Sequence, residues 1–442
     1  MPEFRAGELS QWVSRLWSNG MPDGVVKGVT QDTRTLEPGD LYVAIEGENH
    51  DGHDYLREAF GKGAVGAMVK EGFPWAENPV LKVPDPIRGL QDLARGYRKK
   101  WLGTPIGITG SVGKTTVKEM CAEILALSGK THRTAGNYNN HIGLPLTMLA
   151  MPQDARYGVF EVGMNHPGEM VELAGMLQPK MVILTDICNA HREHFESIEA
   201  IAREKAKLAE RVPASGLVIL DIDSEWYALM RRPICAHVVS VSLGGAADYV
   251  GKPVSGDVLR VNGVDYAMPL PGEHIMRNAL RAIALGLELG LAPEAVAEGL
   301  GRFRNAPMRW QESEIDGIRF INDAYNANPL SMRAGLRTFA TLPGEGRKWA
   351  VVGGMLELGD TEAEEHAALG RFIDELPLDG VIAVGEPGRM IRCEKTAQFH
   401  HCGAATDAAL MLKENLSEGD RVLLKASRGI RLEQVLERFK EL

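Results

Sequence analysis

The sequence is poor in cysteine and has no cysteine pair at the spacing of a metal or redox site. Its cysteines are scattered, and no CxxC occurs: Cys121, Cys188, Cys235, Cys393 and Cys402. This spacing argues against a zinc site and a disulfide framework, and it predicts free thiols in a reducing compartment. The first residues, MPEFRAGELSQWVSRLW, lack the apolar core and cleavage site of a secretion signal, so we expect a cytoplasmic protein.

Long apolar runs and an excess of positive charge are also missing. No run approaches 18 apolar residues, so no membrane span is predicted. The chain has 49 Lys and Arg against 59 Asp and Glu, a formal net charge of −10, which argues against a general nucleic-acid binder. An anionic small molecule is still compatible with this charge, because a few local amides and cations suffice to bind it.

What the sequence does contain is alternating apolar strands and amphipathic helices over 442 residues, with 49 glycines. This length exceeds one compact core, and strand–helix alternation predicts α/β domains with mostly parallel sheets. We expect a small α/β domain over 1–83, a central domain over 84–303 that opens with a helical connector at 84–101, and a Rossmann-like α/β domain over 304–442.

The segment GITGSVGKTT, residues 107–116, reads as a phosphate-binding loop between the strand PIGIT and the helix TVKEMCAEILAL. It departs from the common G-x-x-x-x-G-K-[ST] pattern, because Ile108 stands where the first glycine belongs. A generic glycine turn before a helix is the alternative. The physical requirements of a phosphate site are nevertheless met: small Gly110 and Gly113, a cationic Lys114, and a hydroxyl at Thr115 to reach Mg²⁺. The loop therefore predicts binding of ATP or GTP.

A loop of this kind needs an acid on a neighbouring strand to hold the metal ion. Glu161, in FEVGMNHPGE, is the better candidate, and Asp186, in ILTDIC, is a weaker rival. In NAHREH a single imidazole could join an oxygen-rich Mg²⁺ shell; His191 is nearer the strand end, whereas His194 suits a structural role. Lys205 reads from the residues alone as one of several charges on a solvated helix.

Polar residues farther along the chain suit the rest of a nucleotide. The amide of Asn278 could read both edges of adenine, and Asp323 just after a strand could accept hydrogen bonds from ribose hydroxyls. Arg309, arriving from the next domain, could neutralise charge on a transferring phosphoryl group. The run NDAYNANP, which includes Asn326, could equally be a turn-rich loop.

Together these motifs resemble the Mur ligases, the ATP-dependent amide-forming enzymes of peptidoglycan synthesis. Within that family the resemblance is to members that add D-alanyl-D-alanine to UDP-MurNAc-tripeptide, and it spans essentially the whole chain. The segments that carry it are QDTRTLEPGDLYVAIEGENHDGHDYL, ITGSVGKTTVKEM, TAGNYNNHIGLPLTML, FEVGMNHPGEM, AHREHF, PGEHIMRNALRAIAL, FINDAYNANPLSM, GGMLELGDTEAEEH and KASRG. The family's own loop, T-G-x-x-G-K-T-[ST], also lacks the first glycine.

The resemblance implies a role for each matching residue. ATP would contact the loop and a set of later residues: Gly110, Ser111, Val112, Gly113, Lys114, Thr115, Thr116, Asn278, Arg309, Asp323 and Asn326. Of two Mg²⁺ ions, one would be held by Thr115 and Glu161, and the other by His191 and a carbamylated Lys205. Lys114, His191, Lys205 and Arg309 would serve catalysis. The substrates would be held by Thr33 and Arg34 (UDP), by Asn137, Asn139 and Asn140 (acyl substrate), and by Ser427 and Arg428 (amine).

Several positions depart from the family pattern without removing a metal or phosphate ligand: Thr33, Cys188, Ile275, Gly354 and Ala426. The resemblance implies a monomer that makes an acyl phosphate at the substrate's terminal carboxylate and then an amide with D-alanyl-D-alanine. The alternatives are a Mur-type ligase that adds D-glutamate or the third residue, folylpolyglutamate synthase, or a nucleotide-binding subunit that does not ligate and partners a glutaminase.

Overall fold

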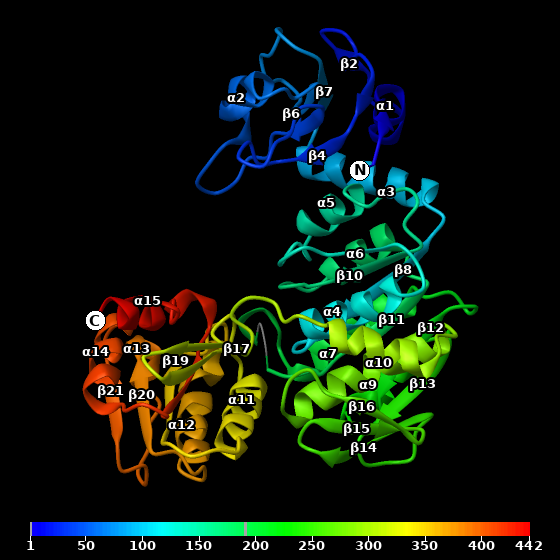
Figure 1. The fold of residues 1–442 in the computed structure, drawn as a ribbon. Coiled ribbons are helices and arrows are strands. Elements are labelled where there is room, and N and C mark those ends of the chain that lie inside the picture. Colours follow the sequence, from blue (N-terminus) through cyan, green and yellow to red (C-terminus); the bar gives the residue numbers. More distant parts are fainter. Residues whose placement is uncertain (1, 190–191) are drawn as a thin grey trace.

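The computed structural model describes residues 2–189 and 192–442. The chain forms an N-terminal, a central and a C-terminal domain, each built on its own main sheet with helices around it (Figure 1). The α/β class and the three-domain organisation predicted from the sequence are therefore confirmed. The predicted limits fall after a strand that ends at Val83 and after a helix that ends at Arg302; as exact boundaries they stay predictions.

The N-terminal domain is a small sheet flanked by two helices. Its main sheet has the order β2-β7-β6-β5-β4, parallel except for β2. Its elements are β1 Phe4–Arg5, α1 Ala6–Val13, β2 Trp17–Ser18, β3 Val25–Val26, β4 Gly28–Thr30, β5 Asp40–Val43, η1 Gly52–Tyr55, α2 Leu56–Gly61, β6 Gly66–Lys70 and β7 Val80–Val83.

Helix α3 (Pro86–Lys100) connects this domain to the next. The Asp85 carboxylate caps it by accepting from the Ile87 amide, and Pro86 occupies its first turn, where a missing N–H costs nothing. Its apolar face is buried between α1 of the N-terminal domain and α5 and α6 of the central domain. The predicted segment is thus a helix, and its packing against both domains was not predicted from the sequence.

The central domain carries the largest sheet, in the order β16-β15-β14-β13-β12-β11-β8-β10-β9. It is parallel from β9 to β14 and ends in antiparallel hairpins. Its elements after α3 are β8 Thr104–Thr109, α4 Lys114–Ala126, β9 Thr131–Arg133, α5 Gly143–Leu149, β10 Tyr157–Glu161, α6 Glu169–Leu177, β11 Met181–Leu184, η2 Arg192–His194, α7 Ile198–Glu210, β12 Leu217–Asp221, α8 Tyr227–Arg231, β13 His237–Ser242, β14 Tyr249–Ser255, β15 Val258–Val261, β16 Val264–Ala267, α9 Glu273–Glu288 and α10 Pro293–Arg302.

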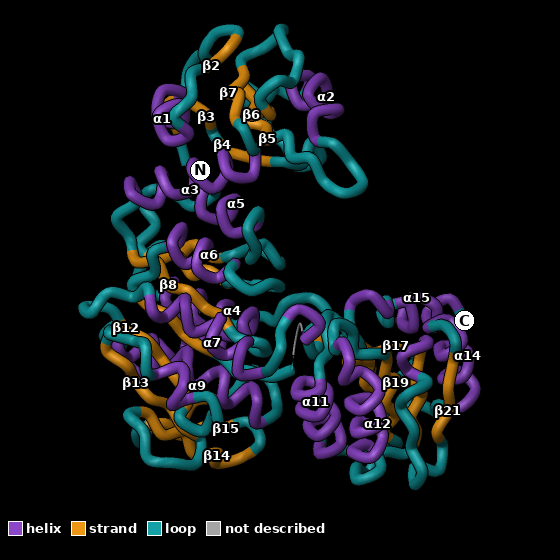
Figure 2. The backbone as a smooth tube through the Cα atoms, turned by 180° about the vertical axis from the view of Figure 1, so that it is seen from behind, coloured by secondary structure: helices purple, strands orange, loops and turns teal. Residues whose placement is uncertain are grey.

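Both faces of this parallel sheet are covered by helices (Figure 2). Ile106, Ile108 and Ile183 point to the face covered by α4, α9 and α10. Phe160 and Val182 point to the opposite face, covered by α5, α6 and α7. This explains why the strands read as continuous apolar runs in the sequence.

The C-terminal domain has the sheet order β17-β18-β22-β19-β20-β21, parallel except for β17. Helices α11 and α12 cover one face, and α14 and α15 cover the other. Its elements are β17 Gln311–Ile315, β18 Ile318–Asn322, α11 Pro329–Thr341, β19 Lys348–Gly353, η3 Gly359–Thr361, α12 Glu362–Ile373, β20 Gly380–Val384, α13 Gly385–Gly388, β21 Phe399–Cys402, α14 Ala405–Asn415, β22 Arg421–Lys425, η4 Arg428–Ile430 and α15 Gln434–Glu441.

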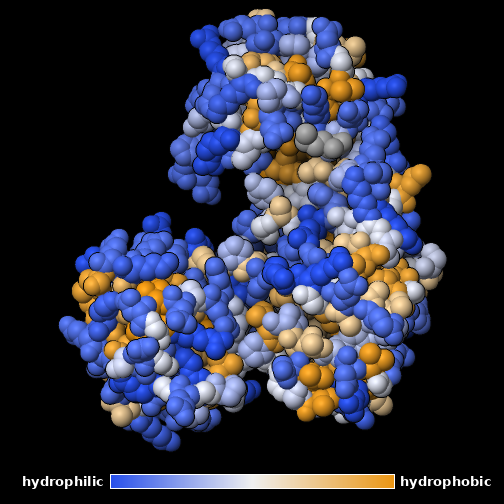
Figure 3. Space-filling model, viewed as in Figure 1, coloured by the Kyte–Doolittle hydropathy of each residue, from blue (hydrophilic) through white to orange (hydrophobic). Residues whose placement is uncertain are grey.

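The N-terminal and C-terminal domains face each other across an open space beside the central domain (Figure 3). The visible surface is mostly hydrophilic, with scattered apolar residues. In the part of the chain that the structure describes, no helix has the length and apolar character needed to cross a membrane.

Candidate nucleotide site

The phosphate loop connects the end of β8 to the start of α4. Gly113 has φ of +87°, and a Cβ atom there would lie 2.6 Å from the Asn278 side-chain oxygen, so a larger residue does not fit. A Cβ atom on Gly110 would similarly meet Thr185 Oγ1 at 1.9 Å. The two glycines that the sequence singled out are therefore required by close packing as well as by the turn.

Part of the loop backbone is used inside the protein. The amides of Ser111 and Val112 donate to the Asp186 carbonyl oxygen at 2.7 and 3.2 Å. The first-turn amides of a helix have no intrahelical partner. In helix α4 no side chain among the described residues caps them. The loop can thus offer an anion the N–H groups of Lys114, Thr115 and Thr116, together with the positive end of the helix dipole.

The Lys114 side chain folds back over the loop. Its Nζ donates to the carbonyl oxygens of Gly110 at 2.9 Å and Ser111 at 3.3 Å. Burial lowers the pKa of Lys114, and the Glu161 carboxylate opposes that change. A phosphate group in the loop would accept the hydrogen bonds that Lys114 now gives to the backbone.

Thr115 is the point at which three elements meet. Its hydroxyl donates to Glu161 Oε2 at 2.8 Å and accepts from Arg309 Nη2 at 3.1 Å. The other oxygen of Glu161 accepts from Asn139 Nδ2 at 2.7 Å. Glu161 is buried and ends β10, which pairs in parallel with β8. Because the carboxyl ends of parallel strands share one edge of the sheet, Glu161 lies next to the loop that follows β8.

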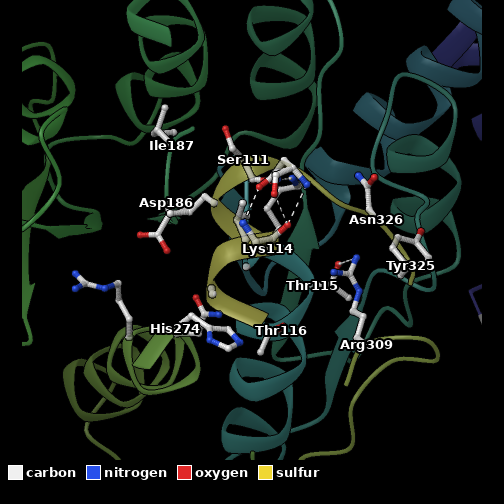
Figure 4. Close-up of a pocket in the computed structure, with 18 of the residues that line it drawn as sticks. Ser111, Lys114, Thr115, Thr116, Asp186, Ile187, His274, Arg309, Tyr325 and Asn326 are labelled. Carbon is white, nitrogen blue, oxygen red and sulfur yellow. Dashed lines mark hydrogen bonds between the residues drawn. The ribbon is translucent and has the colours of Figure 1, made fainter. Parts of the chain in front are cut away.

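Arg309 comes from the segment between the central and C-terminal domains. Its guanidinium group lies over the ring of Tyr325, 4.3 Å from the ring centroid. In Figure 4, Arg309, Tyr325 and Asn326 approach the phosphate loop from one side, and Asp186 approaches from the other. The arrangement brings Arg309 and the YNANP segment to the phosphate loop; the nucleotide roles that the resemblance implies for Arg309 and Asn326 stay predictions.

Asp323, which follows β18, is held by two neighbours. Lys425 Nζ donates to Asp323 Oδ2 at 2.5 Å, and the Trp310 amide donates to Oδ1 at 3.2 Å. Sequence reasoning missed Lys425. The signal was available, because its apolar strand DRVLLK ends at the same edge of the parallel sheet as the strand before Asp323.

These residues line one cavity of about 1000 Å³ between the central and C-terminal domains. Most of the predicted nucleotide, metal and acyl-substrate residues lie on its wall: Ser111, Val112, Gly113, Lys114, Thr115, Thr116, Asn137, Asn139, Asn140, Glu161, Asn278, Arg309, Asp323 and Asn326. Gly110 lies directly behind this wall, where its carbonyl oxygen accepts from Lys114.

Asp186, the rival candidate for the metal, is engaged elsewhere. Its carboxylate accepts from Arg281 Nη2 at 2.6 Å, and its carbonyl oxygen holds the loop. Glu161 is the acid that contacts Thr115. Among the described residues, no group of three or more His, Cys, Asp and Glu side chains is placed to hold a metal ion.

The residues predicted for the second metal ion are only partly described. His191 lies outside the described residues. Lys205, on α7, is 1% exposed, and burial, followed by the charge of Lys114, holds its pKa well below the usual value. Lys205 is thus not on a solvated helix face, contrary to the reading from the residues alone. His194 pairs with Glu193 at 3.1 Å and lies against the ring of His166.

The remaining predicted substrate residues lie outside the cavity wall. Arg34 is exposed in the N-terminal domain and pairs with Asp32 at 2.6 Å, next to the buried Thr33. In the C-terminal domain, the Ser427 hydroxyl donates to the Ala327 carbonyl at 3.2 Å and accepts from the Leu356 amide at 3.0 Å. The exposed Arg428 pairs with Glu433 at 2.6 Å.

Comparison with known proteins gives the family. Three segments match models of Mur ligase domains: residues 25–98 the Mur ligase family catalytic domain, residues 108–286 the middle domain, and residues 308–428 the glutamate ligase domain. The UDP-N-acetylmuramoyl-tripeptide–D-alanyl-D-alanine ligase of Bacillus subtilis (strain 168) is 36% identical over 431 residues, 93% of each chain. The chain belongs to the Mur ligase family. The resemblance seen in the sequence motifs is confirmed.

Other Mur ligases match over similar lengths. The Escherichia coli (strain K12) enzyme with the same name is 31% identical over 441 residues, which are 95% of each chain. Crystal structure I of MurF from Acinetobacter baumannii aligns with a TM-score of 0.92 at 28% identity over 100% of both chains. MurF from Thermotoga maritima in complex with ADP aligns with a TM-score of 0.84 at 26% identity, over 94% of this chain and 97% of that one.

Proposed function

We infer that the chain is an ATP-dependent Mur ligase that joins D-alanyl-D-alanine to UDP-N-acetylmuramoyl-tripeptide. The observation that carries this inference is the convergence at Thr115. A phosphate loop, an acid on the neighbouring strand and an arginine from the next segment meet there in one cavity. Relatives of nearly the same length, named for this reaction, support the choice of substrates.

We place ATP in the cavity with its phosphates at residues 110–116. The uncapped first turn of α4 and Lys114 would bind the phosphates, and Arg309 would approach the transferring group. Asn278 lies beside the loop, where the base would sit, and Asp323 and Asn326 would face the ribose. The MurF structure from Thermotoga maritima, described in complex with ADP, supports a nucleotide here.

The first Mg²⁺ site would use Thr115 and Glu161. Their oxygen atoms are 2.8 Å apart at the cavity wall, and a hydroxyl with a carboxylate is a donor set that suits Mg²⁺. A bound ion supplies neutralisation of phosphate charge during transfer. Arg309 contributes charge at the same place from the protein itself, since its guanidinium already contacts Thr115.

The second ion would be held by His191 and by Lys205 after carboxylation. An ammonium group cannot ligate a cation, whereas the carbamate formed from a neutral amine and CO₂ offers oxygen atoms. Lys205 suits that reaction because its burial and the neighbouring Lys114 lower its pKa, and so favour the neutral amine. The same positive charge of Lys114 would then stabilise the carbamate.

Carboxylation has a direct test. Wild-type enzyme in ¹³C-bicarbonate should give a carbamate resonance that Lys205→Ala lacks, and short carboxylates should restore part of the activity lost by Lys205→Ala. Lys180→Ala, at an exposed lysine of the same domain, is the control. A carbamate resonance that is unchanged in Lys205→Ala would exclude carboxylation of Lys205, and full activity of that variant without carboxylates would exclude a catalytic role for it.

The chemistry follows from the poor leaving group of a carboxylate. The terminal carboxylate of the tripeptide attacks the γ-phosphorus of ATP, the bond to the β-phosphate oxygen breaks, and ADP leaves. The amine of D-alanyl-D-alanine then attacks the acyl carbon, loses its proton, and inorganic phosphate leaves with the former carboxylate oxygen. Lys114 and Arg309 would balance charge in the first step.

The N-terminal and C-terminal domains would hold the two ends of the substrates. We propose that Thr33 and Arg34 contact the uridine diphosphate, that Asn137, Asn139 and Asn140 face the acyl end, and that Ser427 and Arg428 face the incoming amine. ATP and a nucleotide-linked precursor are both cytoplasmic metabolites, so we place the reaction in the cytoplasm.

Phosphate release from ATP separates this function from its alternatives. It should require both UDP-MurNAc-tripeptide and D-alanyl-D-alanine. Release that requires D-glutamate and a shorter precursor would instead indicate another Mur-type ligase. No release with any acyl acceptor would indicate a nucleotide-binding subunit that does not ligate.

A further inference from the structure

Arg281 is a wholly buried arginine on α9, one turn after Asn278. Its Nη2 donates to Asp186 Oδ1 at 2.6 Å and to Asp221 Oδ2 at 3.0 Å. Its Nη1 donates to Asn278 Oδ1 at 3.2 Å. One guanidinium group therefore binds side chains that follow β11, end β12 and lie on α9.

Two of these partners touch the nucleotide site directly. The Asp186 carbonyl oxygen holds the phosphate loop by accepting from the Ser111 and Val112 amides. The Asn278 amide packs against Gly113 and lines the cavity. Arg281 itself does not line the cavity, so any effect on a nucleotide would pass through Asp186 and Asn278.

The surroundings leave the guanidinium group little freedom. Asp221 is also buried, and its Oδ2 accepts from Arg277 Nη1 at 2.7 Å. The planar guanidinium group donates to fixed acceptors in several directions. A lysine cannot replace it, because all donors of an ammonium group are on one nitrogen atom. Breaking one contact would leave a buried carboxylate partly unpaired, which is costly.

The hydrogen bond from Arg281 to Asn278 Oδ1 fixes the orientation of the Asn278 side-chain amide. A free amide can turn by 180° and exchange its acceptor and donor. Adenine presents an amino donor at C6 beside an acceptor at N1, whereas a 6-oxopurine presents an acceptor at C6 beside a donor at N1. One orientation of the amide therefore complements adenine, and the flipped orientation complements a 6-oxopurine.

We propose that Arg281 is a specificity-determining positioning residue: it fixes the orientation of the Asn278 amide and, through Asp186, ties that amide to the phosphate loop. Selection of adenine over 6-oxopurine nucleotides then depends on a residue that touches no nucleotide. This inference rests on the proposed function, because it takes the cavity as the ATP site and Asn278 as the reader of its base.

The test compares ATP with inosine 5′-triphosphate, which replaces the amino group at C6 by an oxygen and protonates N1. In Arg281→Met the ratio of kcat/KM for ATP to kcat/KM for inosine triphosphate should fall by about tenfold or more, because a charged hydrogen bond to the amide is lost. The KM for the UDP-linked peptide should not change. Arg281→Lys, which keeps the charge, should show the same fall if Arg281→Met does not fold.

Asn278→Ala shows whether the effect passes through the amide. That variant should lower the nucleotide ratio by itself, and adding Arg281→Lys to it should lower the ratio no further. Arg260→Met, which breaks an exposed pair with Asp265 in the same domain, is the control for loss of an arginine.

Two results would overturn the inference and leave Arg281 a structural residue. One is an equal decrease of kcat/KM for ATP and for inosine triphosphate in the Arg281 variants. The other is an equal further fall in the ratio of the two values when Arg281→Lys is added to Asn278→Ala. Failure of the proposed function looks different. In that case the wild-type enzyme would itself not couple ATP to ligation, whatever the behaviour of its variants.

Discussion

At the scale of single residues, the site depends on side chains that hold one another in place at the cavity wall. Lys114 donates to its own loop, and Arg309 and Glu161 share the Thr115 hydroxyl. These contacts fix the cation, the acid and the arginine beside the phosphate loop, where a phosphate group and a metal ion would bind. That preorganisation reduces the cost of binding a highly charged nucleotide.

Lys114→Ala should lower kcat for ligation by at least about 10²–10³-fold, because the transferring phosphoryl group loses the ammonium group that Lys114 would bring to it. The measurement is phosphate release with both substrates present. Lys130→Ala, which removes an exposed lysine paired with Asp154, should leave the rate unchanged. Substantial ligation by Lys114→Ala would remove the basis for placing the phosphates in this loop.

Glu161→Gln should raise the Mg²⁺ concentration needed for half-maximal activity by about tenfold or more, because an amide is a weaker ligand than a carboxylate and presents a donor toward Thr115 or Asn139. A titration of activity with Mg²⁺ measures this shift. Glu298→Gln, in an exposed pair with Arg302, is the control. An unchanged Mg²⁺ requirement would mean that the metal is held elsewhere.

At the scale of elements, the sequence predicted strongly patterned segments well. The strand PIGIT before the phosphate loop and the helix after it, α4, were predicted from an apolar run and helical spacing. Strands β14 and β16 are harder to predict, because β14 carries Gly251 and Pro253 and both strands are mostly exposed, so their apolar residues show no clear period. Short strands such as β9 carry too few residues to show a period.

Some residues of the candidate site could be predicted from the sequence, and others could not. Residues with a distinctive local setting, such as Lys114 and Glu161, were predicted from the sequence, and the structure places both at the cavity wall. Lys425 and Arg281 were not predicted. The strand pattern points to the sheet edge where Lys425 lies, but its partner Asp323 is 102 positions away, and Arg281 binds Asp186 across 95 positions. Lys205 was misread from the residues alone as solvated, since its helix has charges on all sides and only packing shows which of them are buried.

The turn before β22 gives an element-scale prediction of pH dependence. Burial raises the pKa of Asp420, but the Arg347 guanidinium and the Ser417 and Arg347 amides outweigh it and leave the pKa below its ordinary 3.8. The stabilisation from this carboxylate is therefore complete above about pH 4 and is lost as the pH falls through the lowered folded-state value.

Asp420→Asn should consequently lower the free energy of unfolding by about 2 kcal/mol at pH 7, with a smaller difference from wild type at more acidic pH. Urea unfolding at a series of pH values measures both effects. Asp407→Asn, at an exposed position on α14, should have little effect. A difference between Asp420→Asn and wild type that grows toward acidic pH would contradict the assignment of this carboxylate.

At the scale of the whole molecule, the nucleotide cavity lies between two domains, and the N-terminal domain faces the C-terminal one across an open space (Figure 3). An acyl phosphate is destroyed by water, so the domains should approach each other once substrates are bound. Contacts that already cross the interface, such as Asn189 with Thr361, show where the C-terminal domain meets the central one.

Small-angle scattering should therefore record a smaller radius of gyration with a non-hydrolysable ATP analogue and the UDP-linked peptide than with neither. The same data should give the mass of one chain, as expected for a monomer. In Arg309→Met, which removes the hydrogen bond to Thr115, the radius of gyration should decrease less under the same conditions. An unchanged radius with both ligands bound would contradict closure, and a doubled mass would contradict the monomer.

The most direct measurement of the proposed reaction is the release of inorganic phosphate from ATP with each substrate omitted in turn. Release should be fast only when UDP-MurNAc-tripeptide and D-alanyl-D-alanine are both present, with one peptide product formed for each phosphate. Phosphate release that is independent of D-alanyl-D-alanine, or that occurs without a peptide product, would contradict the assignment of the chain as this ligase.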